Sequence, residues 1–472
     1  MNSMYSDTIV APATTPGTGA ISIVRVSGPD CFKVVDAVVK LKSGTISGAA
    51  AYSISYGEVY EPDGSVLDQV LVSVFRAPHS YTGEDSAEIS AHASSYIVSE
   101  LVRLLIAVGA RFAEPGEFTR RAFLNGKMDL AQAEAVADVI SSTTSASHRV
   151  AMNQLKGGFS QELAGLRTEL LDTASLLELE LDFSEEDVEF ADRKHLAELL
   201  DTALKHVNRL AASFKQGNMI KNGVPVAIVG ATNAGKSTLL NSLLGEDRAI
   251  VSDIAGTTRD TIEETLNLNG ILFRFIDTAG IRESSDTIEN IGIDRAYQKL
   301  SQADIVLAML DPKTDLVSQS KLVLDKVDLA SQKLFFIVNK ADLLSQGDIN
   351  NNVILFNNFV SSANYKCNII ELSAKTGFGL EDLKNALVEC EKDLIPNSDS
   401  VFVTNERHYQ SLQEASASLS RCRVSLDKGL ATELLSEDLR SAISSVNAIL
   451  GTSLLDPETI LHSIFSHHCI GK

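Results

Sequence analysis

A glycine-rich octapeptide holds the residues best suited to chemistry. GATNAGKS occupies positions 230–237, and its spacing of glycine, four residues and Gly-Lys-Ser is that of a phosphate-binding loop. Glycines allow backbone N–H groups to close around phosphate oxygens, and a following helix adds the positive end of its dipole. We expect Lys236 to bridge the β- and γ-phosphates and Ser237 to ligate Mg²⁺. By spacing alone, an ordinary glycine-rich strand–helix turn remains the alternative.

Two further motifs that suit a nucleoside triphosphate follow in the chain. The polar loop SDIAGTTRD, at 252–260, contains Thr257 and Thr258. A threonine hydroxyl in such a loop can ligate Mg²⁺ while its backbone N–H contacts the γ-phosphate. In the later DTAG motif, Asp277 is placed to hold Mg²⁺ through water, and the Gly280 N–H to contact the γ-phosphate.

Two last motifs select the base. Asp342 of Asn-Lys-Ala-Asp can accept hydrogen bonds from guanine N1–H and its 2-amino group, whereas adenine would leave that carboxylate unpaired. Ser-Ala-Lys at 373–375 offers a backbone N–H to guanine O6. The five motifs in this order predict guanine-nucleotide binding and GTP hydrolysis. The predicted GTP contacts are Asn233, Ala234, Gly235, Lys236, Ser237, Thr238, Ser252, Asp253, Ile254, Ala255, Gly256, Thr257, Thr258, Asp277, Thr278, Ala279, Gly280, Asn339, Lys340, Asp342, Ser373 and Ala374.

The elements that must position these motifs alternate regularly in residues 219–385. Short apolar runs alternate there with helical segments, which predicts a doubly wound, mainly parallel sheet of the Ras-like P-loop type. The predicted strands lie in VPVAIVG, LFRFIDTAG, ADIVLAMLD, KLFFIVNK and NIIELSAK.

The flanking regions have different patterns. Residues 1–125 are typical of an α+β domain, with strands expected at 21–28 and 70–77 and a helix at about 94–108. Helical periodicity dominates on both sides of the nucleotide motifs, so a mixed domain is inserted into a discontinuous helical domain whose halves could form one bundle. The predicted division is 1–125, 126–218, 219–385 and 386–472.

Composition limits the class of protein. The 472 residues suit two to four domains, and 62 acidic against 41 basic residues give a net charge of −21. Such a surface repels phosphate backbones, so a nucleic-acid substrate would need a local basic patch or a partner protein. Five cysteines without a CxxC pair favour a reduced, cytoplasmic protein, and we expect no signal peptide or membrane helix.

Several segments outside the nucleotide motifs carry a resemblance to one family. They are DTIVAPATTPGTGAISIVRVSG at 7–28, SYTGED at 80–85, PGEFTRRAFLNGKMDLAQAEA at 115–135 and the terminal CIGK. With the GTPase motifs, they make the whole chain resemble the MnmE (TrmE) family of tRNA uridine 5-carboxymethylaminomethyl modification GTPases.

The resemblance implies how hydrolysis proceeds. Ile281 follows DTAG where many nucleotide switches place a water-orienting glutamine. In the family a later glutamate does this work, and the matching residue is Glu289. A potassium ion takes the place of an arginine finger and stabilises developing charge. Its matching ligands are Asn233, Ser252, Ile254 and Thr257. Without the resemblance, Glu289 would be an ordinary surface carboxylate and Asn233 a loop-stabilising asparagine.

The resemblance also implies an N-terminal site for a reduced folate, either 5,10-methylene- or 5-formyl-tetrahydrofolate. The matching positions are Arg25, Glu88, Lys127 and Lys472. A carboxylate such as Glu88 suits the guanidine-like edge of a pterin, although spacing alone would make each of these residues a surface charge. Cys469 is a candidate reactive thiol near the folate carbon, and a buried structural thiol is its alternative.

At four places the chain has residues that differ from those usual in the family, and the last two places concern the folate pocket. They are Thr232 for proline, Ser252 for threonine, His92-Ala93-Ser94 for His-Gly-Gly and His468 for an aromatic residue.

As a member of this family the protein would be a homodimer that works with tRNA and the FAD-binding MnmG (GidA) partner. The pair would add a carboxymethylaminomethyl or aminomethyl group to C5 of wobble uridine 34. Two alternatives stay open. A ribosome-assembly GTPase should carry an RNA-binding appendage such as a KH-type GXXG loop, and we find none. A non-enzymatic dimeric GTP switch would only control partner binding.

Overall fold

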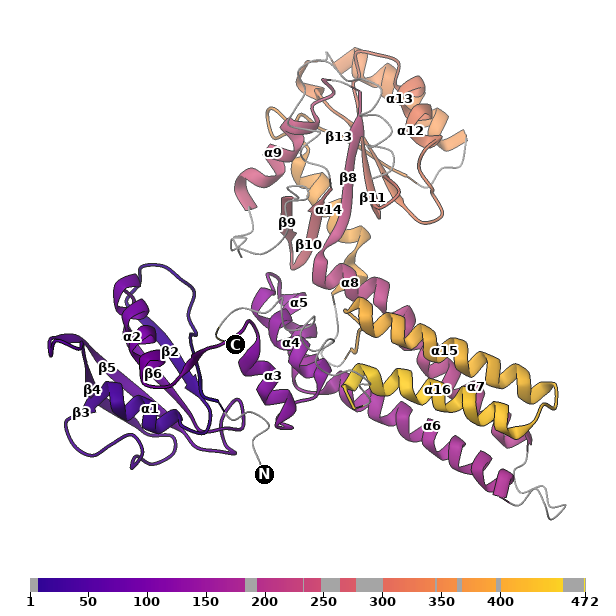
Figure 1. Ribbon diagram of the computed structural model, residues 1–472. Coiled ribbons are helices and arrows are strands. Elements are labelled where there is room, and N and C mark those ends of the chain that lie inside the picture. Colours follow the sequence, from indigo (N-terminus) through magenta and orange to yellow (C-terminus); the bar gives the residue numbers. More distant parts are fainter. Residues whose placement is uncertain are drawn as a thin grey trace, which may run out of the picture. The chain divides into compact units, whose positions relative to one another are not determined.

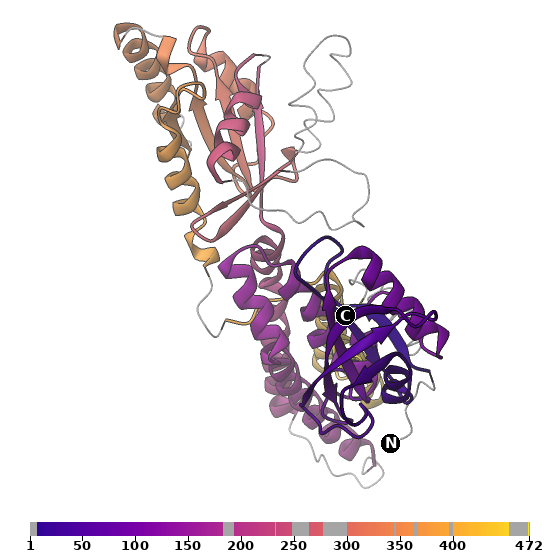
Figure 2. The same cartoon turned by 90° about the vertical axis from the view of Figure 1, so that its left-hand side faces the viewer.

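The computed structural model describes residues 7–182, 193–231, 233–247, 264–276, 300–343, 346–362, 367–395, 400–452 and 471. The chain forms two compact units. The first unit contains residues 1–140, 154–205 and 414–472, and the second contains 141–153 and 206–413 (Figures 1 and 2).

The first unit is built on a seven-stranded sheet in the order β3-β4-β5-β6-β2-β1-β7. Neighbouring strands are antiparallel except β1 and β7, which are parallel. The predicted strands at 21–28 and 70–77 correspond to β2 and the second half of β5. The bounds are β1 Ile9–Pro12, β2 Ile21–Ser27, β3 Val39–Leu41, β4 Ile54–Tyr60, β5 Val66–Phe75, β6 Ser86–His92 and β7 Arg111–Phe112.

The two faces of this sheet differ. Helices α1 (Cys31–Val38) and α2 (Ser95–Ala107) pack with one face into a core that includes Val24, Val72 and Ile89. The predicted helix at 94–108 is therefore confirmed. The side chains between these core residues point to the opposite face of the sheet, as the two-residue period of a strand requires. This open face carries Ile54, Ser73, Glu88 and Arg25, aligned in register across four strands.

Helices from both ends of the chain form the remainder of the first unit. Helix α6 packs along α16, and the Arg167 Nε donates to Asn447 Oδ1 over 2.9 Å. Figure 1 shows α6, α7, α15 and α16 running alongside one another. The expected pairing of the two helical stretches is confirmed. The helices of the first unit are α3 Glu117–Leu124, α4 Leu130–Ser141, α6 Gly158–Asp182 and α16 Thr432–Leu450. Helices α7 Arg193–Ala212 and α15 Glu406–Asp427 continue into the second unit, and most of α5 Ser145–Leu155 belongs to that unit.

The second unit contains a six-stranded sheet in the order β13-β12-β11-β8-β10-β9, parallel except for the edge strand β9. The apolar side chains of α9 and α14 pack in one cluster, and those of α12 and α13 pack in the other, so helices cover both faces. The doubly wound prediction and its five strands are confirmed. The bounds are β8 Val224–Gly230, β9 Glu264–Leu268, β10 Ile271–Phe275, β11 Ile305–Leu310, β12 Lys333–Val338, β13 Asn368–Glu371, α8 Phe214–Asn222, α9 Lys236–Asp247, α12 Leu316–Leu324, α13 Gln346–Ser362, α14 Leu380–Cys390 and the 3₁₀ turns Ala341–Leu343 and Lys392–Leu394.

Candidate functional site

The phosphate loop lies between the end of β8 and the start of α9. Both of its flanking glycines are required by close contacts. A side-chain carbon added at Gly230 would lie 2.5 Å from the carbonyl oxygen of Met309, and one at Gly235 would lie 2.2 Å from Nδ2 of Asn339. Their φ angles of +150° and +101° also favour glycine. The motif's glycines therefore fit the loop against the neighbouring strands β11 and β12.

Lys236 begins α9 and folds back over the loop. Its Nζ donates to the carbonyl oxygens of Gly230 and Ala231 over 2.8 and 3.0 Å. Burial lowers the pKa of the Lys236 ammonium. A phosphate oxygen is charged and would accept a stronger hydrogen bond from the ammonium than these neutral carbonyls do. A bound phosphate could therefore replace them as the partner of Lys236.

Asn339 connects the phosphate loop to the base-recognition loop. It follows β12 and is buried. Its Nδ2 donates to the carbonyl of Ala234 over 2.8 Å, and its Oδ1 accepts from the backbone N–H of Ala374 over 3.0 Å. Ser373 in turn donates from Oγ to Asp342 Oδ1 over 2.5 Å. The structure thus brings together the predicted residues that would bind guanine.

Asp311 is a residue of this site that the sequence prediction missed. It follows β11, and its Oδ2 lies 2.7 Å from Nζ of Lys340. Burial alone would raise the pKa of the Asp311 carboxyl, but hydrogen bonding to the Lys340 ammonium reverses this and the pKa is lowered. The ion pair fixes Lys340, whose φ of +64° is in the left-handed region. The only signal in the sequence was an aspartate at the end of a predicted strand.

Several predicted residues lie outside the part of the chain that the structure describes, and their roles stay predictions. They are Ser252, Asp253, Ile254, Ala255, Gly256, Thr257, Thr258, Asp277, Thr278, Ala279, Gly280, Glu289, Cys469 and Lys472. Within the described residues, no group of three or more His, Cys, Asp or Glu side chains could hold a metal ion. The Ser237 hydroxyl, in the first turn of α9, is an oxygen ligand of the kind that Mg²⁺ prefers.

A second polar centre lies on the open face of the first unit's sheet. Arg25 Nε and Nη2 donate to Glu88 Oε1 over 3.0 and 2.9 Å, and Arg25 Nη1 donates to the carbonyl of Gly471 over 3.2 Å. The guanidinium carbon lies 5.4 and 5.6 Å from the ring centroids of Tyr81 and Phe118, within cation–π range. Arg25 and Glu88 were both predicted, whereas the two rings were not.

The other predicted residues of this centre are placed differently. The Lys127 Nζ donates to the carbonyl of Pro78 over 2.9 Å, and no described contact joins it to Glu88. Of the CIGK segment the structure describes Gly471, whose carbonyl accepts a hydrogen bond from Arg25. A side-chain carbon at Gly471 would lie 2.0 Å from the carbonyl oxygen of Pro12, so this approach requires glycine.

The described cysteines are poor nucleophiles. Burial raises the pKa of the thiols of Cys390 and Cys422 to about 12, and it raises the pKa of Cys31 well above its usual value. A nucleophilic cysteine must be a thiolate near neutral pH. The thiols of Cys31, Cys390 and Cys422 are therefore protonated near neutral pH.

A loop that closes on phosphates and a loop built for guanine, held by one asparagine on a doubly wound sheet, define a P-loop GTPase. Among the described residues, no helix has the length and apolar character needed to cross a bilayer.

Comparisons with known proteins identify the family. The family model "MnmE helical domain" matches residues 130–469, and "GTP-binding protein TrmE N-terminus" matches residues 8–127. The tRNA modification GTPase MnmE of Bacteroides fragilis is 50% identical, covering 99% of this chain and 100% of its own. That of Porphyromonas gingivalis is 46% identical, covering 100% and 99%. A solved structure of Aquifex aeolicus Era bound to GDP·AlF4⁻ is 26% identical over 41% of this chain and 66% of its own, with a TM-score of 0.28. The chain belongs to the tRNA modification GTPase MnmE family, and it is a GTP-hydrolysing enzyme.

Proposed function

We propose that this GTPase modifies the wobble uridine of certain tRNAs together with an FAD-binding partner of the MnmG type. The observation that carries the proposal is the pairing of a preformed guanine-nucleotide site with a separate Arg25–Glu88 centre in a chain that is related over its full length to MnmE proteins. The product would be a carboxymethylaminomethyl or aminomethyl group at C5 of uridine 34. The proposal also includes the four-part division 1–125, 126–218, 219–385 and 386–472, and a cytoplasmic location.

In the proposed GTP reaction, the chain's own residues bind and orient the nucleotide. Lys236 would pair with the β- and γ-phosphates, and Asp342 would select guanine. Glu289 would orient the attacking water. Mg²⁺, held by Ser237 and Thr258, would neutralise phosphate charge, and K⁺ would do the work of an arginine finger. The proposed K⁺ ligands are Asn233, Ser252, Ile254 and Thr257.

The second centre would bind a reduced folate as the one-carbon source. Glu88 already binds a planar group that carries several N–H donors, since both of its bonds come from the Arg25 guanidinium. The guanidine-like edge of a pterin offers the same kind of donors. Lys127 and Lys472 would bind the glutamate tail, and Cys469 would lie near the transferred carbon.

The open face of the first unit's sheet supports the proposed homodimer. Ile54 and Leu71 project from β4 and β5 with exposed fractions of 68% and 47%, and Ile21 on β2 is 66% exposed. Apolar side chains that share one sheet face favour burial against a second copy. The net charge of −21 supports leaving most tRNA contacts to the partner protein.

Mass spectrometry of tRNA nucleosides from cells lacking this gene tests the proposal. We expect the C5-modified wobble uridine to disappear and to return with the wild-type gene. A matched rescue with Asp342→Asn, which disfavours guanine, should restore little modification. Unchanged wobble uridine in the deletion strain would refute the proposed function and favour a role as a GTP switch.

A further inference from the structure

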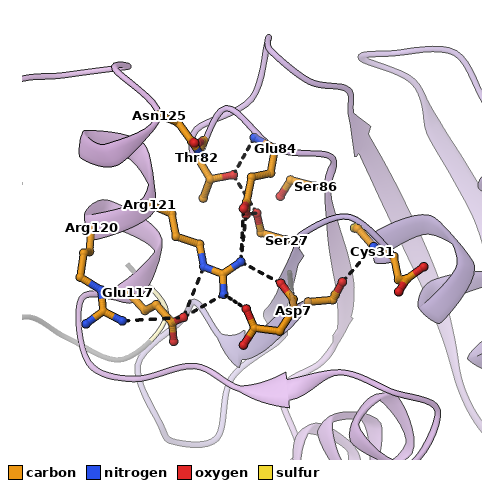
Figure 3. A network of polar contacts seen from close by, with 12 residues as sticks. Asp7, Ser27, Cys31, Thr82, Glu84, Ser86, Glu117, Arg120, Arg121 and Asn125 are labelled. Atoms are coloured by element: carbon orange, nitrogen blue, oxygen red, sulfur yellow. Dashed lines mark hydrogen bonds and ion pairs between the residues drawn. The ribbon is translucent and has the colours of Figure 1, made fainter. Parts of the chain in front are cut away.

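Arg121 is the largest buried charged side chain in the described part of the chain, and the proposed reaction does not use it. Its side chain is fully buried. Figure 3 shows its guanidinium surrounded by the carboxylates of Asp7, Glu84 and Glu117. The Nη2 donates to Asp7 Oδ1 over 2.8 Å and to Glu117 Oε1 over 2.9 Å. The Nη1 lies 3.2 and 3.3 Å from the two oxygens of Glu84 and 2.9 Å from the Asp7 carbonyl.

The three carboxylates come from three separate segments. Asp7 precedes β1, Glu84 lies in the loop between β5 and β6, and Glu117 begins α3. A buried guanidinium is stable only when its donors are paired, so the three segments must keep their relative positions. Arg121 therefore joins the 80–85 loop to helix α3.

Further hydrogen bonds extend this junction. The hydroxyls of Tyr81 and Thr119 are 2.8 Å apart, and Asn125 Nδ2 donates to the carbonyl of Thr82 over 2.7 Å. Ser27, two residues after Arg25 on β2, donates from Oγ to Glu84 Oε2 over 2.9 Å. The SYTGED and PGEFTRRAFLNGK segments, far apart in sequence, thus form one packed body.

The junction determines what surrounds Arg25. Tyr81 lies three residues before Glu84, and Phe118 directly follows Glu117. Their rings are the two that contact the Arg25 guanidinium. A shift of the loop relative to α3 would separate these rings and release Arg25 from its position beside Glu88.

We propose that Arg121 is a positioning residue for the folate site: it keeps Tyr81 and Phe118 against Arg25, so that Arg25 and Glu88 present one fixed arrangement to a reduced folate. The inference rests on the proposed function. It assigns no contact between Arg121 and the folate. A purely structural role would lower the stability of the first unit and leave the folate affinity of the folded protein unchanged.

The test measures binding of 5-formyl-tetrahydrofolate to the full-length chain by calorimetry, with thermal unfolding and GTP turnover recorded on the same preparations. Arg121→Lys keeps the charge but loses the planar fork, and Glu84→Gln weakens one partner in a milder way. We expect folate affinity to fall about tenfold or more in Arg121→Lys and less in Glu84→Gln. GTP turnover should stay within about twofold, as should folate affinity in the exposed control Arg103→Lys.

A second pair of variants tests the rings and does not disturb the buried charge. Tyr81→Leu removes the ring beside Arg25, whereas Tyr81→Phe removes only the hydroxyl that contacts Thr119. We expect the leucine variant to lose about tenfold in folate affinity and the phenylalanine variant to lose less than about threefold.

The outcomes separate the two proposals. Wild-type folate affinity in folded Arg121→Lys and Tyr81→Leu proteins would overturn the positioning role and leave the folate site in place. No folate binding by the wild-type chain would remove the folate site, and the positioning role with it. A loss of folate affinity in both Arg121→Lys and Tyr81→Leu, with GTP turnover preserved, would support the inference.

Discussion

Asn339 holds the two halves of the nucleotide site together, so its removal should be costly. Asn339→Ala deletes the bonds to the Ala234 carbonyl and the Ala374 N–H, at 2.8 and 3.0 Å. Both bonds are buried, and two unpaired backbone groups would remain. We expect the free energy of unfolding of the second unit to fall by about 2–4 kcal/mol, from roughly 1–2 kcal/mol for each group. The GTP dissociation constant should rise at least about tenfold, because the loops lose their common support.

Urea unfolding and calorimetric titration with GTP measure the two effects. The exposed Asn222→Ala, whose Nδ2 bonds only to Asn218 among the described contacts, is a matched control with an expected change under about 0.5 kcal/mol. Gly235→Ala completes a double-mutant cycle. Its new carbon would lie 2.2 Å from Asn339 Nδ2, and Asn339→Ala removes that amide. The double variant should therefore lose less stability than the sum of the two single losses, by about 1 kcal/mol. Additive losses, or an Asn339→Ala protein as stable as the control, would refute this reasoning.

Three other outcomes can be measured on the same protein. Burial raises the pKa of Asp7 and Glu117, but guanidinium hydrogen bonds reverse this and leave both lowered. Their stabilisation is therefore present at neutral pH and lost as pH falls below about 4, so acid unfolding followed by circular dichroism should affect the first unit there. Asp311→Asn should weaken GTP binding by about threefold in calorimetry, since the pair with Lys340 is partly exposed; an unchanged affinity would exclude a positioning effect. Glu289→Ala should bind GTP normally but hydrolyse it at least about a hundredfold more slowly in a phosphate-release assay, and near-normal turnover would end that assignment.

The second unit was the more predictable part of the fold. Its parallel strands are buried on both faces, so they are continuous apolar runs, as in Ile305–Leu310. The edge strand Glu264–Leu268 alternates buried and half-buried residues and was missed. Five strands of the first unit's sheet were also missed. Strands β1, β3 and β7 are short, β4 is partly exposed, and β6 consists mostly of small and polar residues. On α16, Leu434 is 49% exposed, and the buried stripe begins at Leu435.

Motif spacing identified the residues that are proposed to bind one shared ligand, such as Lys236 and Asp342. It could not locate those that act through tertiary contacts. Arg120 and Arg121 are adjacent in sequence and chemically identical, yet only Arg121 is buried among three carboxylates. Packing alone distinguishes them, and no local pattern records it. The same reason explains why Tyr81 and Phe118 were missed.

The contact between Arg25 and Gly471 has a consequence for how the protein is made. The ribosome adds Gly471 446 residues after Arg25, when the nucleotide unit and both halves of the helical bundle have already been synthesised. The N-terminal sheet can pair its strands early, but its polar centre stays incomplete until Gly471 has been added. A nascent chain can therefore acquire the ability to bind GTP before this centre is finished.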